Sequence, residues 1–343
     1  MLDDQSYFRE IDKSDAVGIA LQEPNQLLHH FGVNFEQSEI KNIVYAGMGG
    51  SALAATLSLS WPRFKDPFEI VRGYNLPPYV NEHTLCIVSS YSGNTEETLS
   101  ALNEAESKAA KIIIIAGGGK LEEIANEKKY PLLLLPSAKQ PRYGVFYNYR
   151  ALIEIALFYG VALDGDISKL EGTAAFLNEI VKQWHQQIPV QENLAKQIAL
   201  DCLGKSVVVY GGPLMAPAAY KWKIDFNENA KQVAWNGTYS EFNHNEFIGW
   251  SKQPTEKPYA VVDLRSSFEN PMIMKRFFLS ERLLSGLRPA PIVVNAVGVD
   301  VLSQLLYCVL LGDFVSLYCA IAAGTNPEPV ELVEKFKQML RDQ

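Results

Sequence analysis

The first half of this 343-residue chain alternates short, continuously apolar runs with stretches of helical periodicity. The apolar runs are residues 42–46, 68–72, 84–89, 111–116 and 132–135. A strand that is apolar at every position is buried on both faces, which is typical of parallel sheets covered by helices. Residues 95–111 and 120–129 have the periodicity of crossover helices between such strands. The pattern therefore predicts a doubly wound α/β domain with a parallel sheet.

The same pattern restarts in the second half of the chain, after a long helical stretch. Residues 147–198 carry few strand signals and a charged, glutamine-rich middle, which suits a connector between domains. Residues 206–210, 259–264 and 291–295 then have the character of buried strands, and residues 299–339 predict two helices with a Gly- and Pro-containing break. This second half predicts a further, smaller α/β domain.

The length of the chain also favours two domains, because 343 residues exceed the usual size of one hydrophobic core. We predict an N-terminal domain at residues 1–160, a helical connector at 161–198 and a C-terminal domain at 199–343. Residues 42–55 can be laid on residues 206–219, since in both a strand ends in glycines and a helix of small residues begins. This match favours an internal duplication, although any tight strand-to-helix turn prefers Gly and Ala at these places.

Charge and cysteine content argue against several classes of protein. A formal charge of −8 without any block of Lys and Arg argues against a nucleic-acid surface. The four cysteines lie in apolar surroundings without a CxxC pair, which predicts reduced core residues rather than disulfides or zinc ligands; they are Cys86, Cys202, Cys308 and Cys319. Apolar runs such as 132–135 are far shorter than a membrane span, and the acidic N-terminal segment lacks a signal-peptide core. We expect a cytoplasmic protein without membrane or nucleic-acid partners.

Two loops carry the strongest chemical signals. Gly47-Met-Gly-Gly-Ser51 closes the first predicted strand, and Ser89-Ser-Tyr-Ser-Gly-Asn-Thr-Glu-Glu-Thr98 closes the third and opens a helix. Glycines bring the backbone close to a ligand, the hydroxyls of Ser90, Ser92 and Thr95 can donate hydrogen bonds, and N–H groups at a helix start favour an anion. Each loop taken singly is also explained as a turn with a helix cap. Their shared place at carboxyl ends of strands favours a phosphate cradle without lysine.

A dinucleotide site is an alternative for the first loop, which also fits the fingerprint G-x-G-x-x-[G/A]. A NAD site needs an acidic residue at the end of the second strand. That strand instead ends at Arg72, and Glu69 lies in its middle. Arg72 could serve an NADP site, so this alternative stays open.

The two loops resemble the phosphate loops GxGGS and SxSGxTxET of sugar isomerase (SIS) domain proteins. Over nearly its full length the chain is similar to the bifunctional phosphoglucose/phosphomannose isomerases of archaea and bacteria. The further shared motifs are Pro141-Arg142, Asn227-Glu-Asn-Ala-Lys231, Asn243-His-Asn-Glu246 and a C-terminal helix ending near Phe336-Lys337. The resemblance implies two SIS-type doubly wound domains, each with three α/β/α layers.

The resemblance also implies a role for each matching residue. The residues that would hold the sugar phosphate are Gly50, Ser51, Ser90, Ser92 and Thr95. Arg142 would lie over the reacting carbons, Glu228 would move the proton between C1 and C2, and His244 would assist ring opening. Lys337, or the neighbouring Lys335, would close the site from the C-terminal helix. The family needs no cofactor or metal, and its members are homodimers in which the histidine comes from the partner chain.

Aldose–ketose isomerisation asks for these residue types independently of the family. Removal of a proton beside a carbonyl needs a positioned base, and the developing enediolate oxygen needs a cation or hydrogen-bond donors. We therefore expect interconversion of glucose 6-phosphate and fructose 6-phosphate, and also of mannose 6-phosphate and fructose 6-phosphate. Thr325 is a candidate for the residue that permits mannose substrates.

Two other functions use the same loops. One is a sugar-phosphate-binding SIS protein without turnover, and the other is an enzyme with a different specificity, for aminosugar or pentose phosphates. A regulator of this kind is often fused to a basic DNA-binding helical domain, and none precedes Gly47 in this sequence. The chemistry-bearing types at Glu228, His244 and Arg142 favour the isomerase over a sensor.

Overall fold

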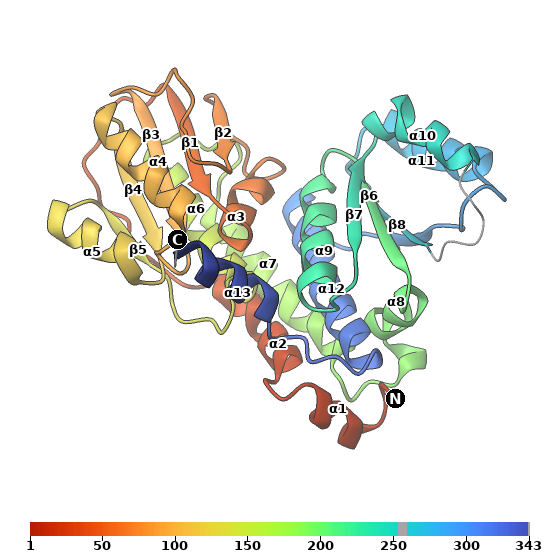
Figure 1. Ribbon diagram of the computed structural model, residues 1–343. Helices are drawn as coiled ribbons and strands as arrows, with labels where there is room; N and C mark the ends of the chain where they lie inside the picture. The colour runs from red at the N-terminus through yellow and green to blue at the C-terminus, as the bar shows by residue number, and fades with distance from the viewer. Residues whose placement is uncertain (253–258, 342–343) are drawn as a thin grey trace. The chain divides into compact units, whose positions relative to one another are not determined.

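The computed structural model describes residues 1–252 and 259–341 and consists of two compact units (Figure 1). The first unit contains residues 22–178 and 298–305, and the second contains residues 1–21, residues 179–297 and the chain from residue 306 on. Each unit is built on its own parallel sheet, which confirms the predicted fold class.

The sheet of the first unit has five parallel strands in the order β2-β1-β3-β4-β5. They are β1 (Asn42–Gly47), β2 (Phe68–Val71), β3 (Thr84–Ser90), β4 (Lys111–Ala116) and β5 (Leu132–Leu134). Each lies where an apolar run predicts it, and β3 is buried at every position. In the register of β1 and β3, Gly47 lies beside Ser89. The two loops of the predicted phosphate cradle therefore leave one edge of the sheet side by side.

Helices cover both faces of this sheet. They are α3 (Gly50–Ser58), α4 (Glu96–Ser107), α5 (Gly119–Lys128), the 3₁₀ turn η1 (Pro141–Tyr143) and α6 (Val145–Phe158). Two further helices, α2 (Ala16–Gln26) and α7 (Ile167–Ile180), each contain residues assigned to both units. Helices α4 and α5 pack on the face that carries Val44, Cys86 and Ile114. Because side chains alternate along a strand, Tyr45 points to the opposite face, which α3 and α6 cover.

The second unit repeats this arrangement with four parallel strands in the order β7-β6-β8-β9. They are β6 (Ser206–Gly211), β7 (Ala234–Thr238), β8 (Tyr259–Arg265) and β9 (Ile292–Asn295). The sequence predicts β6, β8 and β9 but misses β7. In this edge strand only Ala234 is fully buried, so it lacks the continuous apolar run on which the prediction depends.

Helices of the second unit come from three parts of the chain. They are α1 (Gln5–Ile11), η2 (Val181–Trp184), η3 (Val190–Glu192), α8 (Leu194–Cys202), α9 (Ala216–Glu228), η4 (Glu241–His244), α10 (Glu246–Gly249), η5 (Trp250–Lys252), α11 (Pro271–Leu283), α12 (Val301–Ala322) and α13 (Glu331–Arg341). The two helices predicted for residues 299–339 are confirmed as α12 and α13.

Helix α12 is long and apolar enough to cross a membrane, yet its apolar stretch is wholly buried within the protein. A helix that is apolar all round is also what the core of a large protein contains. It carries buried polar residues as well, and Ser316 accepts a hydrogen bond of 2.9 Å from Asn229 Nδ2. The helix was predicted from the sequence, but the expectation that apolar runs are far shorter than a membrane span is wrong for α12.

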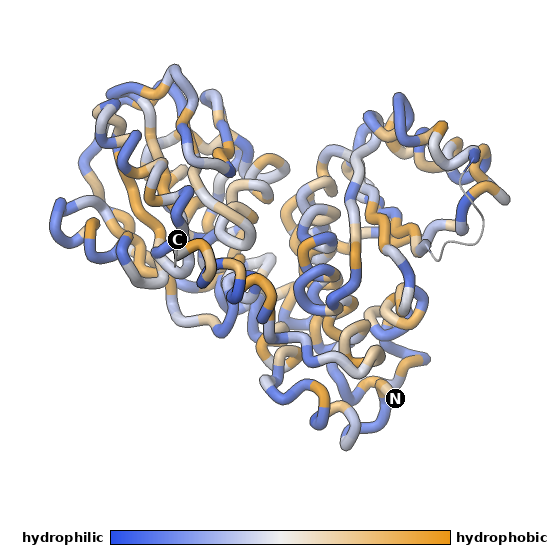
Figure 2. The backbone as a smooth tube through the Cα atoms, in the orientation of Figure 1, coloured by the Kyte–Doolittle hydropathy of each residue, from blue (hydrophilic) through white to orange (hydrophobic). Residues whose placement is uncertain are grey.

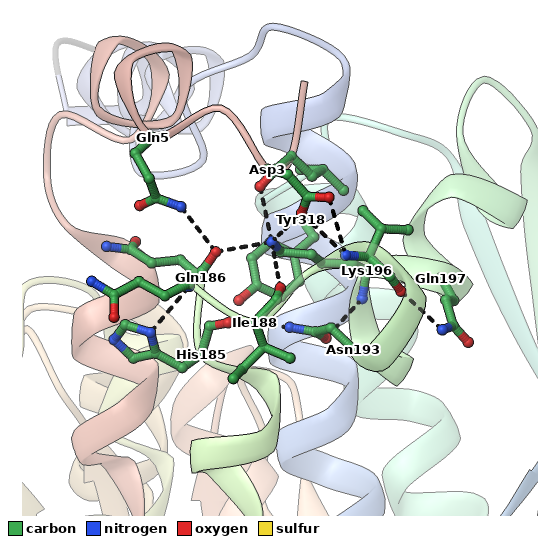
Figure 3. A network of polar contacts seen from close by, with 12 residues as sticks. Asp3, Gln5, His185, Gln186, Ile188, Asn193, Lys196, Gln197 and Tyr318 are labelled. Carbon is green, nitrogen blue, oxygen red and sulfur yellow. Dashed lines mark hydrogen bonds and ion pairs between the residues drawn. The ribbon is translucent and has the colours of Figure 1, made fainter.

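Within the second unit, Lys196 on α8 binds the N-terminal segment of the chain (Figure 3). Its buried Nζ lies within 2.9 Å of the carbonyl oxygens of Leu2, Gln186 and Ile188 and of Asp3 Oδ1. A buried ammonium group is stable only with such acceptors. This side chain therefore joins three separate parts of the sequence.

Apolar burial dominates both units, and Figure 2 shows hydrophobic residues along the strands of both sheets. All four cysteines are buried and free of disulfides, in agreement with their interpretation as core residues; they are Cys86, Cys202, Cys308 and Cys319. Burial raises the pKa of the Cys86 and Cys319 thiols to about 12. These groups are neutral at physiological pH.

Candidate active site

The two predicted phosphate loops meet at the carboxyl edge of the first sheet. Ser51, near the start of α3, accepts a hydrogen bond of 2.9 Å at its Oγ from the N–H of Tyr91. The hydroxyl of Ser90 lies 2.8 Å from that of Thr95 and 3.4 Å from that of Ser92. The structure thus brings together the four hydroxyl side chains that the sequence predicts for phosphate binding.

The side chain of Thr95 does not cap its own helix. It is the N-cap residue of α4, yet its side chain makes no cap hydrogen bond and its hydroxyl faces Ser90 instead. The first N–H groups of any helix lack intrahelical acceptors and carry partial positive charge. Hydroxyls and a helix start therefore converge in a way that suits an anion.

A buried polar network supports the cradle from behind. The hydroxyl of Tyr45 lies 2.9 Å from both the carbonyl oxygen of Ser51 and Asn148 Oδ1. Asn148 Nδ2 donates to the same carbonyl at 3.1 Å and to Ser89 Oγ at 3.0 Å. Burial raises the pKa of Tyr45 well above its usual range, so it remains a neutral donor. Sequence analysis missed this network, although a tyrosine inside a buried strand signals a need for a partner.

A glycine turn before α5 packs against the cradle loop. Leu121 N–H donates to Gly93 O at 3.0 Å, and Lys120 N–H donates to Asn94 Oδ1 at 3.1 Å. Gly93 has φ +67°, and a Cβ added to it would lie 1.7 Å from Gly118 O. Only glycine fits at this position, because both the conformation and the space exclude a side chain.

Arg142 belongs to the same unit as the cradle and lies close to it. It sits in η1, is 1% exposed, and places its guanidinium 4.7 Å from the centre of the Tyr143 ring. A Cβ added to Gly50 would come within 3.2 Å of Pro141 C and 3.3 Å of Arg142 N. The backbone of the arginine segment therefore abuts the start of α3, and glycine at position 50 permits this approach.

Glu228 and His244 lie in the second unit, at opposite edges of its sheet. Helix α9 starts after the carboxyl end of β6 and runs back, so its last residue, the half-buried Glu228, lies at the amino edge, ahead of β7. His244 ends η4, which follows the carboxyl end of β7, and it is exposed. The five residues of β7 span about 17 Å. A single chain therefore does not bring these two residues together.

Packing in the second unit holds the loop that carries His244. Phe242 is buried against Tyr210, with ring centres 4.7 Å apart, and the guanidinium of Arg288 lies 5.5 Å from the centre of each ring. Asn243 Nδ2 donates to Ser280 Oγ at 2.8 Å. The residues before His244 are thus fixed in the core while the imidazole is left at the surface.

Helix α9 also contains a buried charge cluster one turn before Glu228. Lys221 Nζ donates to Asp225 Oδ1 at 2.5 Å and also binds Asp313 of α12. Burial and the nearby charge of Asp313 raise the pKa of Asp225 well above its usual range, although the Lys221 ammonium acts in the opposite direction. The cluster ties the C-terminal turns of α9 to the core.

The remaining predicted residues lie at the end of the chain. Lys337 is exposed on α13 and forms an ion pair of 2.9 Å with Glu334, and Lys335 is exposed as well. Thr325 follows α12, is half-buried, and donates its N–H to Ala320 O at 2.9 Å.

Two further observations concern the residues that could bind a metal or a nucleotide. Within residues 1–252 and 259–341, His, Cys, Asp and Glu form no group of three that could hold a metal ion. Arg72, the residue considered for NADP, donates from Nη2 to Thr56 Oγ1 at 2.6 Å.

Comparison with known proteins gives several matches over most of the chain. A family model for the bacterial phospho-glucose isomerase C-terminal SIS domain matches residues 191–340. A bifunctional phosphoglucose/phosphomannose isomerase of Caldicellulosiruptor bescii is 32% identical over 94% of this chain and 96% of its own. The protein of the same name from Aquifex aeolicus is 31% identical over 94% and 99%. A D-glucosamine-6-phosphate 4-epimerase of Sulfolobus acidocaldarius is 32% identical over 65% of this chain and 68% of that protein.

Solved structures share the fold at lower sequence identity. A glucose-6-phosphate isomerase like protein of Thermus thermophilus superposes with a TM-score of 0.66 at 20% identity, covering 98% of each chain. Tagatose-6-phosphate ketose/aldose isomerase of Escherichia coli gives a TM-score of 0.64 at 17% identity, covering 95% of this chain and 93% of the other. These similarities establish the two-sheet architecture.

Proposed function

This chain belongs to the bifunctional phosphoglucose/phosphomannose isomerase family, and from that premise we propose that it interconverts glucose 6-phosphate and fructose 6-phosphate, and mannose 6-phosphate and fructose 6-phosphate. The observation that carries the proposal is the 32% identity over 94% of the chain to a relative of that name. The hydroxyl cradle of the first unit supports it. The enzyme would serve glycolysis and gluconeogenesis in the cytoplasm.

The cradle is the proposed site of the 6-phosphate. Ser51, Ser90, Ser92 and Thr95 offer hydroxyl donors, and the lack of a side chain at Gly50 lets the Arg142 segment approach the start of α3. Hydroxyl groups and the N–H groups at a helix start can stabilise a phosphate dianion, so the site does not require a lysine. This fits a chain whose net charge is −8.

Proton transfer would rely on a carboxylate and a guanidinium. We assign Glu228 as the base that takes the proton from C2 of the aldose and returns it to C1, through a cis-enediol. Arg142 would stabilise the oxygen that gains negative charge in the enediolate. Glucose and mannose differ only at C2, so one enediol serves both sugars if the proton can return to either face of that carbon.

Ring opening is the proposed task of His244, supplied by the second chain of a homodimer. The positions of Glu228 and His244 at opposite edges of one sheet support a role for the histidine in trans. Exposed apolar side chains near it, on α10 and α11, support a partner chain on this face; they are Ile248, Met272, Phe278 and Leu283. Lys337 would close the site from α13.

The first experiment is a coupled assay of the purified protein, without added metal or nucleotide. We expect fructose 6-phosphate to form from both glucose 6-phosphate and mannose 6-phosphate, and Glu228→Gln to lose at least about 10²-fold in kcat for both sugars. Glu171→Gln, at an exposed position on α7, is the matched control and should keep full activity. A folded wild-type protein that turns over neither sugar contradicts the proposal.

Mixed dimers test the role of His244 in trans. Glu228→Gln and His244→Ala are each expected to be nearly inactive, whereas a mixture allowed to exchange subunits should regain about a quarter of wild-type activity, because half of the dimers carry one intact site. If both residues acted within one chain, no mixture would gain activity.

An epimerase activity is the second candidate, because the 4-epimerase relative is 32% identical over 65% of the chain. Incubation with glucosamine 6-phosphate and analysis for the C4 epimer separates the two functions. Epimer formation without isomerisation of the neutral sugars would favour this candidate.

A further inference from the structure

The second sheet has a loop arrangement that matches the phosphate cradle of the first sheet. The strands β6 and β8 correspond in sheet order to β1 and β3. Five residues, 91–95, connect β3 to α4, and five residues, 266–270, connect β8 to α11. In the turn after β1, the N–H of Ser51 donates a hydrogen bond to Met48 O at 3.0 Å. In the turn after β6, the N–H of Met215 donates one to Gly212 O at 2.9 Å.

The side chains that fill the two arrangements differ. By these correspondences, Met215 stands in place of Ser51, and Arg265 stands in place of Ser90. The guanidinium of Arg265 donates to Asp263 and Glu281 at 3.0 Å. The hydroxyls of Ser51 and Ser90 therefore have no counterpart at these two positions, whereas Ser267 stands in place of Ser92 in the loop after β8.

Glu269 lies where the second arrangement would hold an anion. Its Oε1 accepts a hydrogen bond of 2.8 Å from the N–H of Leu214, 55 residues away, in the turn that leads into α9. Leu214 corresponds to Gly50, the backbone position assigned to phosphate in the first cradle. Met215, the N-cap residue of α9, makes no side-chain cap hydrogen bond.

Packing leaves little room for another ligand beside this carboxylate. Glu269 is 6% exposed, and a Cβ added to Gly212 would come within 2.4 Å of its Oε1. Burial raises the pKa of Glu269, whereas the N–H groups of Leu214 and Met215 lower it. The carboxylate thus occupies a closed position at the start of a 13-residue helix.

We propose that the second sheet retains an anion cradle whose resident anion is the carboxylate of Glu269, so that each chain binds one sugar phosphate and not two. The number of sugar phosphates bound per chain rests on the proposed function. The assignment of Glu269 as the resident anion rests on the geometry of the second unit alone, and its test does not depend on catalysis.

Chemical rescue tests the built-in anion. Glu269→Ala removes the acceptor of the Leu214 N–H, and we expect the Tm to fall by about 2 to 6 °C, the effect of leaving a buried donor without its acceptor in a domain of this size. Formate should restore most of this loss at pH 8, whereas chloride at equal ionic strength should not. Glu269→Gln keeps an oxygen acceptor and should respond to formate no more than the wild type does. Glu10→Ala, which removes an exposed carboxylate of the same unit, is the matched control.

A binding count completes the test and remains available if Glu269→Ala does not fold. Titration calorimetry of the wild type with 6-phosphogluconate, which cannot isomerise, should give one equivalent per chain, and Ser90→Ala should weaken that single site. Two equivalents per wild-type chain would overturn the proposal, as would a formate response of Glu269→Ala equal to that of the wild type. No binding at all, together with successful rescue, would count against the proposed function and leave the resident anion standing.

Discussion

Asp225 of α9 and Asp313 of α12 bind the same ammonium group. Lys221 Nζ lies 2.5 Å from Asp225 Oδ1 and also contacts Asp313 Oδ1, and all three side chains are almost fully buried. Two carboxyl groups around one buried ammonium cannot both be ionised without a large cost in free energy. This shared contact lies one helical turn before Glu228 and joins α9 to the core helix α12.

Removal of the ammonium group should be severely destabilising. We expect Lys221→Met to lower the free energy of unfolding by about 3 to 5 kcal/mol, because two buried carboxyl groups lose their partner. Urea denaturation followed by circular dichroism measures the change. Lys223→Met, two residues along the same helix and half-buried, is the control and should cost less than about 1 kcal/mol. Equal losses for the two variants would contradict this account of the cluster.

The stability should depend on pH in a direction opposite to that of an ordinary surface aspartate. The pKa of Asp225 is raised in the folded state, so the folded protein binds a proton that the unfolded chain has already released. Stability from this group is then lost as the pH rises from the unfolded pKa through the raised folded pKa. Asp225→Asn mimics the protonated form, and its stability relative to the wild type should increase as the pH rises above the usual pKa of an aspartate. Urea midpoints at several pH values measure this difference, and a constant difference would rule the mechanism out.

Lys196 should control the order of the N-terminal segment. Lys196→Met leaves the carbonyl oxygens of Leu2, Gln186 and Ile188 without their shared donor, so we expect a loss of about 2 to 4 kcal/mol in unfolding free energy. Limited proteolysis should cut the N-terminal segment faster in this variant. Lys182→Met removes an exposed ion pair with Glu179, and it should change neither the free energy of unfolding nor the rate of proteolysis.

Gly93 should tolerate no side chain. Gly93→Ala would place a methyl group against Gly118 O in a backbone conformation of φ +67°, and we expect loss of stability together with a KM for glucose 6-phosphate raised at least about 10-fold. Gly172→Ala on α7, where an added Cβ meets nothing within 4 Å, should instead stabilise the chain by about 0.5 to 1 kcal/mol. Thermal unfolding and initial-rate kinetics on both variants provide the comparison.

Ser90 should act on phosphate affinity. The Ser90 hydroxyl lies 2.8 Å from that of Thr95, and a hydrogen bond to a charged group is worth about 1.5 to 3 kcal/mol. Ser90→Ala should therefore raise KM by about 10- to 100-fold with a smaller change in kcat. Ser100→Ala on the same helix α4 should leave both constants unchanged, and an unaltered KM in Ser90→Ala would remove this residue from the cradle.

Several features could be predicted from the sequence because they depend on local chemistry. Continuous apolar runs predict β1, β3 and β4, since only buried parallel strands require them. Glycines and hydroxyls at the ends of β1 and β3 predict the cradle, and the parallel register places those ends side by side.

Other features depend on contacts between distant parts of the chain. The edge strand β7 has no apolar run, so its pairing with β6 defines it. Residues 1–21 belong to the second unit, where Lys196 of α8 binds Leu2 and Asp3. Glu269 looks like an ordinary loop glutamate in the sequence.

The fold class and the hydroxyl cluster at the ends of β1 and β3 could thus be predicted, because periodicity and turn chemistry act over a few neighbouring residues. Contacts between distant residues place Glu228 and His244 at opposite edges of one sheet, and they place Glu269 against the turn that leads into α9. Both outcomes depend on the direction in which α9 crosses its sheet and on a contact between residues 55 positions apart, and no local pattern specifies either.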